Sequence, residues 1–169
     1  MVIVVTGPEN SGSKMCARTI AHVLNVCDFE DWSGYSWIRN KTSKKHSVLH
    51  RSTPYAGNNV INVDEIIKDY RDEDLRFVFT TRDGNISKNR IKKNRKNYTD
   101  DDAKHFIEEN IKIINKVREE NIPYTFWSFE STILYEETYL HDLYKFIDVK
   151  SEFVPPLFNA NKKYIKIND

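Results

Sequence analysis

The chain has 169 residues, of which 39% are hydrophobic and 30% charged, which suits one domain with its own core and excludes wholesale disorder. Its 26 basic and 25 acidic residues give a net charge of +1, so the chain as a whole is not built to coat nucleic acid or an anionic membrane. Any anion site must be a local cluster.

No apolar run approaches the roughly 20 residues of a membrane span, and the N-terminus lacks the pattern of a signal peptide. Cys16 and Cys27 lie in or near one predicted helix, too far apart along it to bridge. We therefore expect a reduced, cytoplasmic, single-domain protein over residues 1–169.

The N-terminal segment has a distinct order of elements. Residues 1–6 form a run rich in β-branched residues without polar alternation, which is typical of a strand buried on both faces in a parallel sheet. Residues 7–13 form a loop rich in Gly and Ser, and apolar residues at near-helical spacing predict a helix over residues 14–26. The chain therefore opens with a strand, a glycine loop and a helix.

The rest of the chain continues to alternate strands and helices. The predicted elements are a loop over 28–45, strands over 46–52, 76–81 and 124–129, a turn over 53–59, and helices over 64–71, 86–96, 99–117 and 138–147. The third of these helices has the clearest pattern, with Thr99 as N-cap and three aspartates in the first turn. Its predicted apolar stripe is Ala103, Phe106, Ile107, Ile111, Ile114 and Val117. This alternation predicts an α/β fold with a central, mostly parallel sheet flanked by helices. Ligands in such folds bind at the carboxyl ends of the strands.

The glycine loop has the features of an anion site. Backbone N–H groups in such a loop, together with the positive end of the following helix, attract phosphate or sulfate. Gly7 lets the chain leave the strand sharply, and Gly12 lets the backbone approach an anion. Ser11 and Ser13 add hydroxyl donors, and Lys14 adds a full charge. The alternative is a plain strand-to-helix turn.

The residue after Lys14 bears on metal use. Nucleotide-hydrolysing loops read G-x-x-x-x-G-K-[ST], and the final hydroxyl holds Mg²⁺. Here Lys14 is one place late and Met15 follows it, and Met15 cannot ligate a hard cation. The third predicted strand ends in Arg82 and Asp83, so a cation stands where a magnesium-associated carboxylate would be expected, although Asp83 is adjacent. The pattern favours recognition of a phosphoryl-like group without a metal.

The segment from Val4 to Lys14 resembles the 5′-phosphosulfate loop of P-loop sulfotransferases, especially that of small bacterial or phage-type members. The resemblance implies a three-layer P-loop fold and 3′-phosphoadenosine 5′-phosphosulfate as co-substrate, with no metal. Ser11-Gly12-Ser13 matches the family loop, whereas Asn10 stands where Lys is common, so Lys14 would take over that charge.

Two further segments carry the resemblance. Residues 77–83 look like the strand whose terminal Arg-Asp contacts the 3′-phosphate, which assigns that contact to Arg82. The family usually has a Ser eight residues later; that position is Arg90 here, and Ser87 is the nearest serine. Residues 124–147 look like the late strand-Glu-helix segment of the family.

His50 ends the second predicted strand, at the same sheet edge as the loop. A histidine there suits a general base for sulfuryl transfer to a hydroxyl, and the alternative is a structural hydrogen bond. Arg51 and Ser52 are candidates to place acceptor or donor. Glu130 is a site carboxylate or, with more support, a capping or salt-bridging residue.

Several polar and aromatic clusters have two interpretations each. The basic run over 88–96 is either a solvated helix face or a site that attracts the 3′-phosphate or an anionic acceptor. Binding of nucleic acid is disfavoured, because Tyr98 is the only aromatic residue near the run that could stack on bases. Trp32, Tyr35 and Trp37 line an acceptor pocket or pack in the core. Residues 162–164 close over the nucleotide or fray.

Together these inferences predict a sulfotransferase acting on a carbohydrate, lipid or small-molecule acceptor, without nucleic acid or stable membrane insertion. The alternatives are a P-loop kinase of a nucleotide or small metabolite, and a non-catalytic anion-binding or nucleotide-binding protein. The candidate catalytic residues are Lys14 and His50. The candidate donor-binding residues are Asn10, Ser11, Gly12, Ser13, Lys14, Met15, Arg82, Ser87 and Arg90.

Overall fold

A computed structural model describes residues 1–32, 45–55, 59–86, 91, 98–159 and 161. Its four strands form one sheet in the order β2-β1-β3-β4, and every neighbouring pair is parallel. The strands are β1 (Val2–Gly7), β2 (Ser47–Ser52), β3 (Leu75–Thr81) and β4 (Tyr124–Ser128). The predicted α/β class with a parallel sheet is confirmed.

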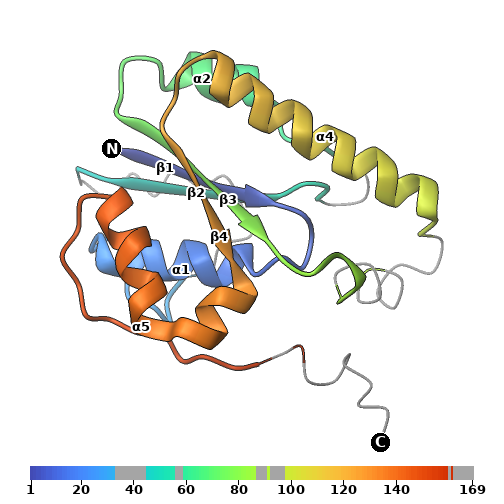
Figure 1. Ribbon diagram of the computed structural model, residues 1–169. Coiled ribbons are helices and arrows are strands. Elements are labelled where there is room, and N and C mark those ends of the chain that lie inside the picture. Colours follow the sequence, from blue (N-terminus) through green and yellow to red (C-terminus); the bar gives the residue numbers. More distant parts are fainter. Residues whose placement is uncertain (33–44, 56–58, 87–90, 92–97, 160, 162–169) are drawn as a thin grey trace, which may run out of the picture.

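Helices cover both faces of this sheet. They are α1 (Ser13–Val23), α2 (Val63–Asp69), α4 (Asp100–Glu119) and α5 (Phe129–Phe146). Figure 1 shows α1 and α5 on one side of the strands and α2 and α4 on the other. Alternate residues of β1 join two apolar clusters, one under α1 and α5 and one under α2 and α4, and all six residues of the strand are buried. The lack of polar alternation along β1 is therefore explained by burial on both faces.

The strand order places a switch point beside the glycine loop. From β1 the chain goes to β2 on one side, and it then crosses to β3 on the other side of β1. In open parallel sheets, ligands bind in the crevice beyond the carboxyl ends of strands at such a reversal. The loop that follows β1 lies at this edge.

Two sequence predictions for helices are wrong in detail. The last helix begins directly after β4 at Phe129, where Ser128 caps it by accepting a hydrogen bond from the Ser131 N–H at 3.2 Å. The helix is kinked at Glu136, whose φ is 41°. In α4, Ile107 and Ile111 are 59% and 50% exposed, and Ile113 is buried in their place. The predicted helix over residues 86–96 falls mostly outside the described residues.

Both cysteines are free thiols, and Cys16 is a buried residue of α1. Burial raises the pKa of the Cys16 thiol, so this side chain is an inert part of the core. Within the described ranges, no helix combines the length and apolar character needed to cross a membrane.

Candidate functional site

Two glycines give the loop between β1 and α1 its path. Gly7 has a φ of +154°, and a Cβ there would lie 2.3 Å from the carbonyl oxygen of Thr80. Gly12 has a φ of +88°, and a Cβ there would lie 2.9 Å from the Phe129 ring and 3.0 Å from Trp127. The sequence suggested that Gly12 leaves room for an anion. The structure shows that its missing side chain leaves room for the aromatic residues at the end of β4 and the start of α5.

Buried hydroxyls fasten the loop to the sheet. The Thr80 hydroxyl donates to the Thr6 carbonyl oxygen at 3.2 Å, so the Ser11 hydroxyl, 2.5 Å from Thr80 Oγ1, is the donor of that pair. The backbone N–H of Ser11 donates to the Pro8 carbonyl oxygen at 3.0 Å. Both donors of Ser11 are therefore used within the protein, and its side chain is fully buried. Ser11, which the sequence suggested as a donor to an anion, therefore anchors the loop to β3 through Thr80.

The N-terminus of α1 differs from the other helix N-termini that the structure describes. The side chains of Asn62, Thr99 and Ser128 cap α2, α4 and α5, whereas Gly12 caps α1 without a side-chain hydrogen bond. The first turn of α1 also has no acidic residue. First-turn N–H groups have no acceptor inside a helix, and the amide nitrogen of Asn10 is buried with no acceptor among the described residues. These donors and the helix dipole together favour an anion.

His50 lies against this helix end. It pairs with Val5 in the sheet register, and its Nε2 atom lies 3.0 Å from Oγ of Ser13, the first residue of α1. The Ser13 side chain is buried, and the neighbouring Lys14 is exposed. Met15 packs partly against the core cluster beneath α1. The structure therefore brings the predicted base, a hydroxyl and a cation to one helix N-terminus.

Arg82 lies beneath the loop with its side chain only 2% exposed. Its guanidinium donates to the Asn10 carbonyl oxygen at 2.8 Å and, through two nitrogens, to Oδ1 of Asn161. The Glu130 carboxylate lies 3.9 Å from Nε, and the guanidinium carbon lies 4.6 Å from the centroid of the Phe129 ring. Nε and both terminal nitrogens of Arg82 thus donate to protein oxygens, one of which belongs to the loop.

Glu130 completes this network. Its carboxylate accepts hydrogen bonds from the Asp83 backbone N–H at 3.2 Å and from the side-chain amide of Asn161 at 2.8 Å. The salt-bridging interpretation of Glu130 fits this geometry. Ser87 and Arg90, the other predicted 3′-phosphate contacts, lie outside the described residues.

Sequence reasoning missed three residues that shape the site: Thr80, Phe129 and Asn161. Thr80 had a usable signal, because it is a hydroxyl residue near the carboxyl end of a predicted strand. Asn161 had none, since it is 79 positions away from Arg82 in the chain. Trp32 packs in the core, and Tyr35, Trp37, most of the basic run over 88–96 and residues 162–164 lie outside the described residues.

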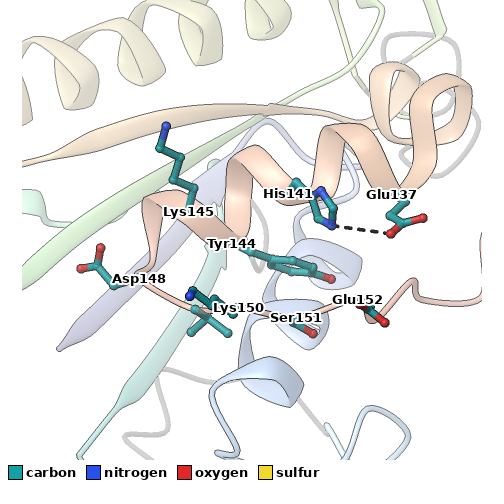
Figure 2. Close-up of a pocket in the computed structure, with 9 residues that line it drawn as sticks. Glu137, His141, Tyr144, Lys145, Asp148, Lys150, Ser151 and Glu152 are labelled. Atoms are coloured by element: carbon teal, nitrogen blue, oxygen red, sulfur yellow. Dashed lines mark ion pairs between the residues drawn. The ribbon is translucent and has the colours of Figure 1, made fainter.

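A separate cavity of about 840 Å³ lies at the C-terminal half of α5 and the segment after it. Figure 2 shows Glu137 and His141 on one side of it, joined by an ion pair of 3.6 Å, and Lys150, Ser151 and Glu152 on the following segment. The Tyr144 hydroxyl donates to the Phe153 carbonyl oxygen at 2.5 Å. Burial raises the pKa of the Tyr144 phenol. None of the predicted site residues lines this cavity.

Among the residues that the structure describes, no group of three or more His, Cys, Asp or Glu side chains is placed to hold a metal ion. Comparisons of the chain with family models, with curated proteins and with solved structures give no match. The function is therefore argued from the chemistry of the site.

Proposed function

We propose that this chain is a P-loop sulfotransferase that moves a sulfuryl group from 3′-phosphoadenosine 5′-phosphosulfate to a hydroxyl or amine of an acceptor. The observation that carries the proposal is the 3.0 Å contact between His50 Nε2 and Ser13 Oγ at the N-terminus of α1. This contact places a side chain that can accept a proton beside a helix N-terminus that favours an anion. Sulfuryl transfer needs both at one place.

The proposed reaction uses few groups. His50 Nε2 takes the proton of the acceptor hydroxyl while the acceptor oxygen attacks sulfur. The bond between sulfur and the bridging oxygen of the donor breaks, and its electron pair stays on the 5′-phosphate. The products are the sulfated acceptor and adenosine 3′,5′-bisphosphate. The first-turn N–H groups of α1 and Lys14 stabilise the charge that develops on the sulfuryl and bridging oxygens. Ser13, released from His50, donates to a sulfuryl oxygen.

Met15 supports a reaction without Mg²⁺. In nucleotide-hydrolysing loops, a hydroxyl residue after the lysine holds the metal. Met15 occupies the position after Lys14, and it packs partly against the apolar core. Lys14 and the helix dipole are then the positive groups that face the donor.

Product formation tests the proposal directly. The protein is incubated with 3′-phosphoadenosine 5′-phosphosulfate, EDTA and a panel of hydroxyl and amine acceptors, and adenosine 3′,5′-bisphosphate is measured by anion-exchange chromatography. His50→Gln should lower the rate about 10²–10⁴-fold, since glutamine cannot accept the proton. His46→Gln, just before the amino end of the same strand, is the matched control and should react like the wild type.

Two results would count against the proposal. A His50→Gln variant as fast as the wild type would remove His50 as the base. Formation of ADP from ATP only with Mg²⁺, and no reaction of the phosphosulfate donor, would identify a kinase instead.

A further inference from the structure

Arg51 lies at the carboxyl end of β2, directly after His50. It pairs with Thr6 in the sheet register. Successive strand residues point to opposite faces, so His50 faces α1 and Arg51 faces the side covered by α2 and α4. Its guanidinium carbon lies 4.7 Å from the centroid of the Tyr55 ring. This cation–π contact helps to hold the guanidinium in place beside the Tyr55 ring.

Among the described residues, none accepts a hydrogen bond from the Nε–H group of Arg51. The atom has almost no solvent exposure, and within the described part of the chain it makes no hydrogen bond. Nor does Arg51 have a carboxylate partner there. Arg82 differs, because its Nε and both terminal nitrogens bind protein oxygens. A buried N–H of a charged side chain is costly to leave without an acceptor, and the oxygen of an oxyanion would satisfy it.

The surroundings of Arg51 provide polar groups and space. The Thr6 and Thr53 hydroxyls are buried 3.5 Å apart on the same face of the sheet. Tyr55, whose ring carries the guanidinium, also lines a cavity of about 390 Å³ between β2 and α2. Glu65 and Asp69 also line that cavity, whereas Arg51 does not, so an anionic group is disfavoured beside those carboxylates and favoured beside the Arg51 guanidinium.

We propose that Arg51 binds an anionic group of the sulfuryl acceptor, that is, a carboxylate, sulfate or phosphate. A guanidinium matches such oxyanions through two parallel hydrogen bonds. This inference rests on the proposed function: the acceptor would cross the carboxyl end of β2, where it meets His50 from one face of the sheet and Arg51 from the other. The same chemistry is present in the 3′-phosphate of the donor, so the experiment must separate the two sources.

The Nε–H resonance of Arg51 reports the binding directly in a ¹H–¹⁵N NMR spectrum of the full chain. It is assigned by its loss in Arg51→Lys. Sodium sulfate is titrated against sodium chloride of equal ionic strength, first without nucleotide and then with saturating adenosine 3′,5′-bisphosphate. We expect sulfate to move the Arg51 resonance saturably in both titrations, while the Arg82 resonance stays in place.

Two variants sharpen the test. Tyr55→Phe keeps the ring and should retain the saturable sulfate shift, whereas Tyr55→Leu removes the ring and should weaken it. Adenosine 5′-phosphate and adenosine 3′,5′-bisphosphate are compared as single additions to identify any contact with the 3′-phosphate.

The outcomes separate this inference from the proposed function. An Arg51 resonance that does not respond to sulfate overturns the inference. The Arg51 resonance could instead move with adenosine 3′,5′-bisphosphate but not with adenosine 5′-phosphate, and then fail to respond to sulfate. That result would assign Arg51 to the 3′-phosphate of the donor and would also overturn the inference. A sulfate response in a protein that binds neither nucleotide supports an oxyanion site at Arg51 and removes the sulfotransferase.

Discussion

Replacing Arg82 by alanine should both destabilise the protein and loosen the glycine loop. One buried guanidinium donates hydrogen bonds to the loop and to Asn161. The side chain is 2% exposed and donates to the Asn10 carbonyl oxygen and to Asn161. Hydrogen bonds from a charged group contribute about 1.5–3 kcal/mol each. The Glu130 carboxylate at 3.9 Å is 30% exposed, so solvent reduces its share. We expect a loss of about 3 kcal/mol, which lowers the melting temperature of a domain of this size by roughly 6–12 °C.

Thermal denaturation measures the loss of stability. Titration calorimetry with nucleotides measures the loosening of the loop as a loss of affinity. Arg76→Ala is the matched control, since Arg76 also binds several groups, including the Phe146 carbonyl oxygen and Asp148, but lies away from the loop. Both variants should melt at a lower temperature. Only Arg82→Ala should bind adenosine 5′-phosphate and adenosine 3′,5′-bisphosphate more weakly, and by the same factor, because the loop faces the group they share.

Two results would refute this reasoning. An Arg82→Ala protein that melts like the wild type would show that the guanidinium does not fasten the loop. A variant that loses affinity for the bisphosphate but keeps its affinity for the 5′-phosphate would show that Arg82 contacts the 3′-phosphate itself, as the family resemblance implies.

Three further substitutions test other parts of the structure. Gly12→Ala should cost about 1–3 kcal/mol in urea denaturation because of contacts of 2.9 and 3.0 Å with aromatic rings, whereas Gly84→Ala, with nothing within 4 Å, should be neutral. Thr99→Ala removes the capping box of α4 and should cost about 1 kcal/mol by the same measurement. A hydrogen bond from Arg76 lowers the pKa of Asp74, so this stabilisation is complete above the unfolded pKa and is lost as the pH falls through the folded one. Asp74→Asn should therefore flatten the fall in the urea midpoint below about pH 4, and an unchanged slope would contradict the pairing.

Local patterns were enough to predict the sheet and the placement of the loop. The apolar run of β1 indicated burial on both faces, and parallel topology brings strand ends to one edge. For this reason the sequence predicted that His50 and the glycine loop share an edge, and the two side chains His50 and Ser13 lie 3.0 Å apart.

The errors arise where tertiary contacts decide the outcome. The apolar residues of α4 occupy a wider face of the helix than the part that packs against the protein. Ile107 and Ile111 therefore stay exposed, while Ile113 is buried. The start of α5 depends on a cap by Ser128, directly after a strand, which a search for apolar periodicity does not detect. The partners of Arg82 could not be predicted, because Asn161 is 79 positions away in the chain.

The most direct test of the central claim is calorimetric titration of the protein with adenosine 3′,5′-bisphosphate in EDTA. The account predicts saturable binding without metal, tighter than that of adenosine 5′-phosphate, because the 3′-phosphate would gain charge-assisted hydrogen bonds from its remaining predicted contacts, Ser87 and Arg90. Equal affinity for the two nucleotides, or binding that appears only with Mg²⁺, would contradict a site for the phosphosulfate donor.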